Sequence, residues 1–171
     1  MTPPPIQTDR LTLRPFRPDD AADLAVSLNK FEVSKWLGLV PHPYSESDAD
    51  WFIERAIPGW PWKAAITQDG ALIGCVDVED GSLGYWFSQS DWGQGLATEA
   101  ARVLVDRYLR ETPEADAITA GYFAGNLGSA NVLRKLGFVV TGQKVLYCKP
   151  QDRDLAHIEV RLSRDGWEAS R

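Results

Sequence analysis

The sequence predicts a mixed α/β fold built on one sheet with helices packed against it. Three observations favour this class. Short apolar runs alternate with segments of helical periodicity along the chain. Three runs in the middle are separated only by short turns that contain Asp-Gly, which is typical of an antiparallel meander. The length of 171 residues suits one core and is too short for two. We therefore expect a single domain over residues 1–171.

The first third of the chain is expected to hold a tail, one strand and three helices. Residues 1–6 contain three successive prolines and predict a flexible tail. Leucines alternating with polar residues predict the strand, and Pro with two acidic residues before an apolar stripe predicts the first helix. A serine that caps the next turn predicts the third helix. The expected bounds are strand 8–15, helix 18–28, short helix 33–37 and a helix from Ser45 or Ser47 to Ile57.

The rest of the chain predicts the meander, a long helix, a strand that returns parallel, another helix and two last strands. Asp69-Gly70 and Asp80-Gly81 supply the two turns of the meander. Gly137 follows a helical stripe and is expected to end that helix, with Phe138 packing back onto it. The expected bounds are strands 62–67, 71–78 and 82–87, a helix to Arg110, strand 117–123, helix 127–136, and strands 139–147 and 157–162.

The stretch Gly84–Leu109 runs from a strand through a Gly-rich turn into the long helix. Free N–H groups and the dipole at a helix start attract anions, and Gly93 and Gly95 lack the Cβ atoms that keep a phosphate away. The turn has neither the Gly-Lys-Ser/Thr of a P-loop nor the spacing of a dinucleotide-binding fingerprint. An anion site and a plain strand–helix joint both fit the residues of this turn.

Composition restricts the class of protein. The content of 44% hydrophobic and 25% charged residues is ordinary for a soluble globular chain. A net charge of −6 argues against general nucleic-acid binding. Cys75 and Cys148 have no metal-binding spacing, so we expect reduced thiols, no metal and a cytoplasmic location. The chain has no run of membrane-spanning length and no signal-peptide pattern, so we expect no membrane partner.

Four segments in this order resemble the GNAT acyltransferases, specifically the RimJ/RimL-like branch that includes the ribosomal-protein N-terminal acetyltransferases. They are TDRLTLRP from Thr8, GYW with WGQGLATEA from Gly84, NLGS from Asn126, and VLRKLGF from Val132. Together they span almost the whole chain. The resemblance implies a central mixed sheet of six to seven strands with about four helices. It also implies an acetyl-CoA-dependent N-acetyltransferase that lets an amine attack directly in a ternary complex.

The resemblance further implies which residues hold the cosubstrate, acetyl-CoA. The family loop reads Gln/Arg-x-x-Gly-x-Gly/Ala, and Trp92, Gly95 and Ala97 take its first, fourth and sixth places here. Trp in the first place is usual in the branch and leaves open which donor replaces the Gln or Arg side chain. The residues expected to bind the cosubstrate are Phe87, Ser88, Trp92, Gly93, Gln94, Gly95, Leu96, Ala97, Thr98, Asn126, Ser129 and Lys135.

Three of these residues also fit ordinary structural roles. Asn126 suits a helix N-cap, Ser129 suits the first turn of a helix, and Lys135 suits the last turn as a solvated charge. Many family members place a catalytic Tyr four residues before the Gly-Phe pair, and that position is Leu133 here. The resemblance therefore implies Ser129 as the catalytic acid that protonates the departing thiolate.

The base that deprotonates the amine has four candidates. Primary amines are largely protonated at pH 7, and a carboxylate near the central strands can accept that proton. Asp77, Glu79 and Asp80 lie on or just after the middle strand, and His157 begins a late strand. We select Glu79 and keep the other three as alternatives, because acidic residues beside a turn glycine are also common for turn chemistry alone.

The acceptor is expected to be a protein N-terminus or a small-molecule amine, and the protein a monomer or a homodimer. Trp36, Trp51, Trp60 and Trp62 precede the meander, where the family builds its acceptor pocket, although core packing explains some of them equally well. Two other functions also remain. One is a non-catalytic acyl-CoA-binding sensor or interaction module, and the other is a nucleotide-binding α/β protein.

Overall fold

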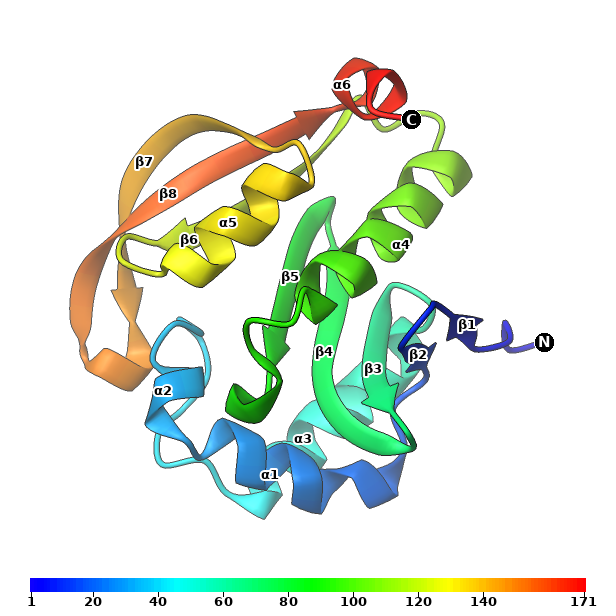
Figure 1. Ribbon diagram of the computed structural model, residues 1–171. Coiled ribbons are helices and arrows are strands. Elements are labelled where there is room, and N and C mark those ends of the chain that lie inside the picture. The colour runs from blue at the N-terminus through cyan, green and yellow to red at the C-terminus, as the bar shows by residue number, and fades with distance from the viewer.

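The sheet has eight strands in the order β1-β2-β3-β4-β5-β6-β8-β7, and six α-helices lie on its two faces in the computed structural model, which describes residues 1–171 (Figure 1). The strands are β1 Ile6–Gln7, β2 Thr12–Arg14, β3 Lys63–Gln68, β4 Ala71–Glu79, β5 Ser82–Phe87, β6 Ala117–Phe123, β7 Val139–Cys148 and β8 Arg153–Ser163. The helices are α1 Ala21–Leu28, α2 Phe31–Ser34, α3 Glu46–Ala56, α4 Leu96–Glu111, α5 Leu127–Lys135 and α6 Arg164–Ala169. The predicted mixed α/β class is confirmed.

The structure adds elements at both ends of the chain. Ile6 pairs with Leu13, so the first strand begins inside the segment predicted to be a tail. The indole Nε1 of Trp60 also donates to the carbonyl oxygen of Pro3 at 2.9 Å. At the other end, α6 has only six residues and buries Trp167. Both additions depend on contacts far apart in sequence, and a segment of two or six residues is too short to show periodicity.

Local signals set the predicted turns and helix ends. Asp69-Gly70 and Asp80-Gly81 each place two successive residues at positive φ, as a tight two-residue hairpin requires. Ser45, rather than Ser47, caps α3, and its Oγ accepts from the backbone N–H of Asp48. Gly137 adopts a φ of +94°, and Phe138 N–H donates to the carbonyl oxygen of Leu133. This is the helix ending predicted for α5.

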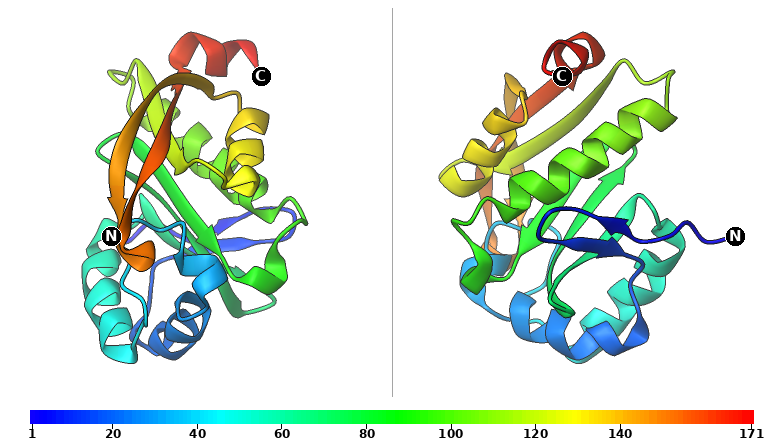
Figure 2. Two further views of the ribbon diagram at one scale, coloured as in Figure 1. Left: turned by 90° about the vertical axis from the view of Figure 1, so that its left-hand side faces the viewer. Right: turned by 45° about the vertical axis from the view of Figure 1, so that its right-hand side comes forward.

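Two hydrophobic clusters lie on opposite faces of the sheet. One face carries α4 and α5 and includes Leu104, Leu133 and Val76. The other face carries α1 and α3 and includes Leu24 and Ile53. Figure 2 shows these helices on the two sides of the strands. Side chains from alternate positions of β5 therefore point toward different groups of helices.

The sheet opens between β5 and β6. These strands are the one parallel pair in the sheet, and a single residue pair, Ser82 and Thr119, joins them. Beyond that pair they diverge, and α4 and α5 follow the two diverging strands (Figure 1). The predicted parallel crossover is thus present, and it leaves the edge of β5 without a strand beside it over most of its length.

Candidate active site

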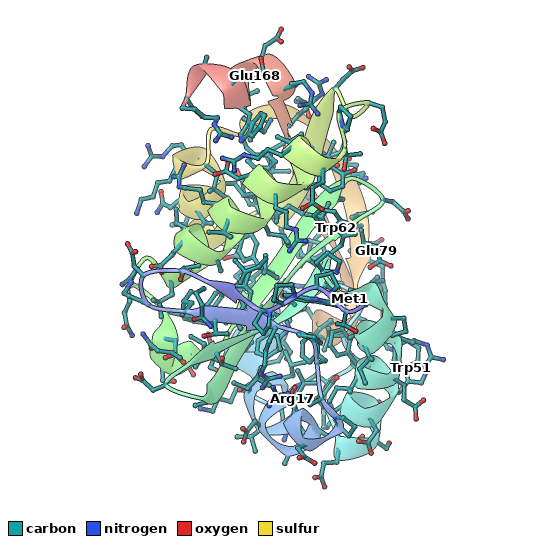
Figure 3. All side chains as sticks on the ribbon, turned by 90° about the vertical axis from the view of Figure 1, so that its right-hand side faces the viewer. Met1, Arg17, Trp51, Trp62, Glu79 and Glu168 are labelled. Atoms are coloured by element: carbon teal, nitrogen blue, oxygen red, sulfur yellow. The ribbon has the colours of Figure 1, made fainter.

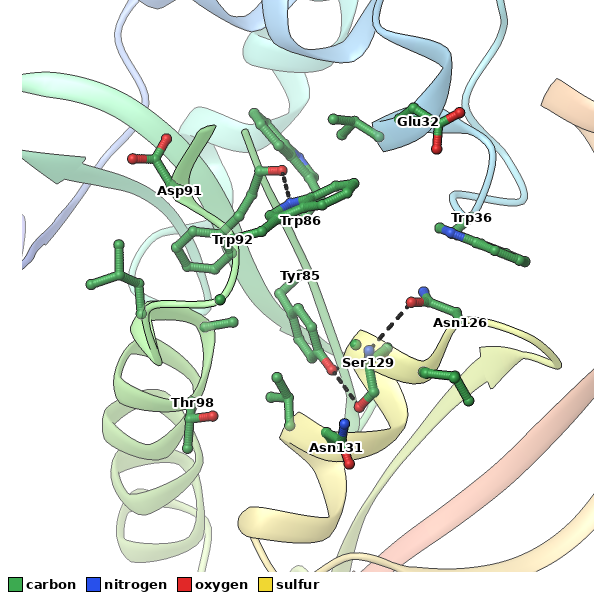
Figure 4. A pocket seen from close by; sticks show the side chains of 18 of the residues that line it. Glu32, Trp36, Tyr85, Trp86, Asp91, Trp92, Thr98, Asn126, Ser129 and Asn131 are labelled. Carbon is green, nitrogen blue, oxygen red and sulfur yellow. Dashed lines mark hydrogen bonds between the residues drawn. The ribbon is translucent and has the colours of Figure 1, made fainter. Parts of the chain in front are cut away.

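The gap between β5 and β6 is occupied by a cleft of about 630 Å³. Its walls come from the end of β5, the loop before α4, the start of α5 and the end of α2 (Figure 4). One side of the cleft is therefore built by β5 and the Gly-rich loop, and the other side by segments that lie far from them in sequence. Ten of the twelve residues expected to bind the cosubstrate line this cleft.

The Gly-rich loop turns sharply into α4. Gly93 and Gly95 have φ values of +73° and +77°, which side chains rarely adopt. A Cβ at Gly93 would meet nothing within 4 Å, so the loop faces open space there. Gly95 is the N-cap of α4 and has no side chain to satisfy the first N–H groups of the helix. Those N–H groups are available to an anion at the mouth of the cleft.

Arg10 holds this loop from the side of the first hairpin. Its Nη1 donates to the carbonyl oxygen of Gln94 at 2.8 Å, and its Nε donates to Glu99 of α4 at 2.7 Å. Glu99 also accepts from the hydroxyl of Thr8 at 2.6 Å. Arg10 Nη2 lies 3.5 Å from the position of a Cβ on Gly95. A guanidinium group therefore lies beside the loop whose family donor is missing.

The exposed edge of β5 offers backbone groups to the cleft. The N–H of Ser88 donates to Ile73 of β4, so by alternation the N–H and C=O groups of Tyr85 and Phe87 face away from β4 and into the gap. The indole Nε1 of Trp92 donates to the carbonyl oxygen of Phe87 at 2.9 Å (Figure 4). A carbonyl oxygen accepts two hydrogen bonds, so Phe87 can still accept one more. This edge can pair with an extended amide-containing ligand as a strand would.

Three polar side chains meet at the start of α5. Tyr85 Oη lies 2.8 Å from Ser129 Oγ, and the side chain of Asn126 accepts from the backbone N–H of Ser129 at 3.3 Å (Figure 4). Burial raises the pKa of Tyr85 to about 12, so the phenol stays protonated at neutral pH. When Tyr85 donates in this pair, the proton of Ser129 is free to point into the cleft. Asn126 is the N-cap of α5, and its side-chain NH₂ remains available.

Most of the predicted cosubstrate residues line the cleft, and two do not. The lining includes Phe87, Trp92, Gly93, Gly95, Leu96, Ala97, Thr98, Asn126, Ser129 and Lys135. The side chain of Ser88 turns away, and its Oγ lies 2.7 Å from Ser27 Oγ of α1. Gln94 is exposed and donates through its amide to the carbonyl oxygen of Ser90. The side chains of Ser88 and Gln94 thus lie outside the lining of the cleft.

Glu79 lies outside the cleft. Its carboxylate accepts from Lys63 Nζ at 2.9 Å, and its side chain is 70% exposed. Figure 3 shows it at the surface of the molecule, near Trp62. Asp77 is on the same side of β4 and is more enclosed, with Lys63 Nζ at 3.9 Å from its Oδ2. Burial raises the pKa of Asp77, and the charge of Lys63 opposes that rise.

The four tryptophans before the meander do not line one pocket together. Of the four that precede the meander, Trp36 alone lines the cleft, and it packs against Gly125. Trp51 projects from α3 beneath Arg55, while Trp62 packs edge-on against Tyr108 of α4 (Figure 3). Trp60 is buried. The other aromatic walls come from Trp86 and Trp92, which lie in and after β5.

Sequence reasoning missed Tyr85 and Arg10 as members of the site. Tyr85 had a usable signal, because strand alternation separates it from Trp86 and directs it toward the helices that flank the gap. Arg10 lies 84 residues before Gln94 along the chain, and no local pattern indicates that contact. His157 was one of the four candidate bases, and it lies on β8 with its ring edge-on to Phe123.

Residues 10–139 match the family described as an acetyltransferase (GNAT) domain. The chain belongs to the GNAT acetyltransferase family. The resemblance seen in the sequence is therefore confirmed, and the mixed sheet that it implied is present.

Two curated relatives are also N-acetyltransferases by name. One is the probable N-acetyltransferase YjcK of Bacillus subtilis (strain 168), which is 36% identical over 79 residues, or 42% of this chain and 43% of that protein. The chain thus matches less than half of that relative's length. The other is the uncharacterized N-acetyltransferase p20 of Bacillus licheniformis, which is 26% identical over 86% of this chain and 89% of that protein.

Solved structures of GNAT proteins share the fold over nearly the whole chain. An acetyltransferase (GNAT family) from Bacillus anthracis has a TM-score of 0.80 at 18% identity, covering 94% of this chain and 99% of that one. The ribosomal-protein-S5-alanine acetyltransferase of Vibrio fischeri has a TM-score of 0.76 at 20% identity, covering 96% and 99%. Mycobacterium smegmatis RimJ, solved in complex with CoA-disulfide, has a TM-score of 0.76 at 21% identity, covering 91% and 82%.

None of the helices has both the length and the apolar content that crossing a membrane requires.

Proposed function

We propose that this GNAT protein transfers the acetyl group of acetyl-CoA to a primary amine by direct attack in a ternary complex. One observation carries the proposal. The free N–H groups at the start of α4, the unpaired edge of β5 and the hydroxyl of Ser129 open into one cleft. An anion site, a strand-like edge and a proton donor are the three features that this reaction needs together.

We assign the chain's own groups to a bound acyl-CoA in order along the cleft. The N–H groups from Gly93 to Thr98 would hold the pyrophosphate. Arg10 would add the charge that the missing Gln or Arg side chain supplies elsewhere in the family. The backbone of Phe87 and the NH₂ of Asn126 would pair with the amides of the pantetheine arm. Trp92 supports this arrangement, since its indole fixes the carbonyl of Phe87 at the edge of β5.

Acetyl-CoA supplies a thioester, and the residues around the gap would carry the protons. A backbone N–H of Tyr85 or Phe87 would polarise the carbonyl oxygen. The amine nitrogen forms the new C–N bond, the C–S bond breaks, and its electron pair leaves with sulfur. Ser129 gives its proton to that sulfur and regains one from the acylated nitrogen. Each turnover of an ammonium substrate therefore releases one proton to solvent.

The resemblance to the RimJ/RimL-like branch supports the acceptor class that we propose. Structures of a ribosomal-protein-S5-alanine acetyltransferase and of RimJ share this fold, and the sequence motifs resemble the same branch. We propose a primary amine as the acceptor, either a protein N-terminus or a small molecule. The net charge of −6 favours cationic acceptors of both kinds.

The test measures thiol release from acetyl-CoA with a panel that contains peptides with free N-termini and small amines. Release that depends on an amine, with the acetyl group found on that amine by mass, is expected. Calorimetry with coenzyme A, ATP and NAD tests the binding step by itself. Tight coenzyme A binding with no release for any amine would favour a non-catalytic acyl-CoA sensor. Preference for ATP or NAD would point to a nucleotide-binding protein.

A further inference from the structure

Two glycines face each other where β5 and β6 begin to separate. Gly84 and Gly121 each lie two residues beyond the joining pair, Ser82 and Thr119. Both are on the face of the sheet opposite α4 and α5, since their neighbours Leu83 and Ala120 belong to the core under those helices. No side chain from these two positions fills the space above the sheet. That space is taken by side chains from the strands on either side.

A titratable side chain leans over each glycine from the outer neighbouring strand. Asp77 of β4 is the register partner of Gly84, and its Oδ1 lies 2.8 Å from the position a Cβ would take there. His157 of β8 leans over Gly121, where a Cβ would overlap the Cε1 of its ring. Adjacent strands are about 4.8 Å apart, so roughly one strand spacing, widened by the divergence, separates the two groups.

Both groups have unused hydrogen-bonding capacity. His157 Nδ1 is a buried side-chain nitrogen with no partner. Asp77 has no donor closer than Lys63 Nζ at 3.9 Å, because that ammonium bonds Glu79 instead. A buried polar atom without a partner is costly, and a ligand that donates to it removes the cost. An ammonium group, with three N–H donors, matches an imidazole nitrogen and a carboxylate.

Along β5, this position adjoins a residue that lines the cleft. Trp86 is the next residue of β5 on this face, and it lines the cleft together with Trp36 and Glu32 from the α2 side (Figure 4). A group held between Asp77 and His157 therefore lies beside the edge of β5 where Tyr85 presents its N–H. That position is on the opposite face of the sheet from α4 and the Gly-rich loop.

We propose that Asp77 and His157, facing each other over Gly84 and Gly121, form the subsite that binds the acceptor as a primary ammonium, and that His157 takes its proton. This inference rests on the proposed function. The proton moves from the ammonium nitrogen to a ring nitrogen of His157 and then to solvent, which leaves a neutral amine to form the C–N bond. Asp77 stabilises the positive charge before and after that transfer.

The surroundings keep the imidazole neutral before the amine arrives. Burial lowers the pKa of His157 below its usual 6.5, the Lys144 charge on β7 lowers it further, and Glu159 on β8 opposes both. From β6 only Gly121 and Phe123 face the ring, and neither carries a charge. A neutral ring can accept a proton at pH 7.

The test compares Asp77→Asn and His157→Asn with wild type, using acetyl-CoA and the amine panel. Each variant is expected to lower kcat/KM for the amine about 100-fold while the coenzyme A dissociation constant and Tm stay unchanged. Wild type is expected to lose kcat/KM at acidic pH as the His157 ring becomes protonated, and His157→Asn should remove this loss. Gly121→Ala, which keeps the imidazole and displaces it, should lower the same constant. Asp154→Asn, an exposed carboxylate on the same strand, is the matched control and should behave as wild type.

The outcomes separate the subsite from the proposed function. A wild type that binds coenzyme A and acetylates amines, with Asp77→Asn and His157→Asn equally fast, overturns the subsite alone. A wild type that releases no thiol with any amine overturns the proposed function and the subsite with it. A peptide and a small amine that lose rate equally in the variants support one ammonium subsite for both. If neither the peptide nor the small amine loses rate in the variants, the ammonium subsite is contradicted.

Discussion

Ser129 and Tyr85 act as one hydroxyl pair at the residue scale. The hydroxyls are 2.8 Å apart, and Asn126 fixes the start of α5 by accepting from the backbone N–H of Ser129. The pKa of Tyr85, raised by burial to about 12, keeps its phenol protonated, so Tyr85 can donate to Ser129 in this pair. Ser129 is then the group whose proton can leave toward the cleft. The family's usual Tyr position is occupied here by Leu133, which is fully buried in the core.

Removing either hydroxyl tests this order of donors. Ser129→Ala should lower kcat about tenfold, because a thiolate with a pKa near 8.5 needs only a weak acid. Tyr85→Phe should cost less, and the double variant should be no slower than Ser129→Ala, since Tyr85 acts through Ser129. Single-turnover rates measure these effects, and coenzyme A titrations should show unchanged binding. Additive losses in the double variant would mean that Tyr85 acts on its own.

The Gly-rich loop and α4 are the elements on which binding depends. Gly95 has a positive φ and leaves the start of the helix without a side chain. No atom lies within 4 Å of the Cβ position of Gly93. An acidic side chain in this loop would bring its charge to the pyrophosphate position. The same substitution elsewhere in the fold would cost only backbone strain.

Gly95→Glu and Gly70→Glu form a matched pair for this element. Gly70 has a φ of +84° with nothing within 4 Å of its Cβ position, and it lies in the β3–β4 hairpin. Both variants pay a similar backbone cost, so their Tm values should fall together. Only Gly95→Glu should weaken coenzyme A binding, by at least about tenfold or 1.4 kcal/mol. Equal affinities in calorimetry would contradict the assignment of the loop.

The contact between the first hairpin and α4 predicts a pH dependence of stability. Burial raises the pKa of Glu99, but hydrogen bonds from Thr8 and Arg10 outweigh it and leave the folded-state pKa below the usual value of 4.5. A carboxyl group whose pKa is lower in the folded state stabilises the protein at any pH above its unfolded-state pKa. That stabilisation is lost as the pH falls through the folded-state pKa.

Glu99→Gln should therefore lower the free energy of unfolding at pH 7 by about 1 kcal/mol. The difference in the free energy of unfolding between variant and wild type should shrink as the pH falls from 5 toward 3. Urea unfolding at several pH values measures both. Glu114 is an exposed carboxylate beyond α4, so Glu114→Gln serves as the control. Its free energy of unfolding should change with pH as that of wild type does. A constant gap for Glu99→Gln would show that its charge does not contribute.

Elements with a strong local signal were predictable from sequence, and elements set by distant contacts were not. The Asp-Gly turns, the Ser45 cap and the Gly137 ending each depend on residues within a few positions, and all three are present. The extension of β8 back to Arg153 depends on its pairing with β7, so its apolar pattern begins later than the strand itself. The same reason explains β1, which pairs only with β2.

The same distinction between local signals and distant contacts applies to the candidate site. Residues of the continuous loop and of the start of α5 were predicted together and do line one cleft. The base was not determined, because Asp77 and Glu79 point to the same side of β4 and the sequence does not show that Lys63 bonds Glu79. A register shift at Ile66 and Thr67 of β3 also changes which positions of β4 face each cluster, and alternation alone does not reveal it.

At the scale of the whole molecule, the sheet consists of two parts joined weakly at β5 and β6. One residue pair links the strands, whereas β4 and β5 are paired along their length. The other links between the parts run through α4 and α5 and through the contacts of the α2 segment with the end of β7, such as Cys148 Sγ to the carbonyl oxygen of Lys35. A ligand in the gap would therefore contact both parts at once.

Such a ligand should stabilise the whole molecule and protect the edge of β5. At a coenzyme A concentration 100 times its dissociation constant, binding adds about 2.7 kcal/mol to the free energy of unfolding. For a chain of this size that corresponds to a rise in Tm of roughly 8 °C. Hydrogen exchange at the amides of Tyr85 and Phe87 should slow in the same samples, because both N–H groups face the gap. With its affinity lowered tenfold, Gly95→Glu at the same coenzyme A concentration should gain only about 1.4 kcal/mol, or about half of the rise in Tm. A rise in Tm without protection of these amides would place the ligand outside the gap, since occupancy there requires the β5 edge to lose contact with water.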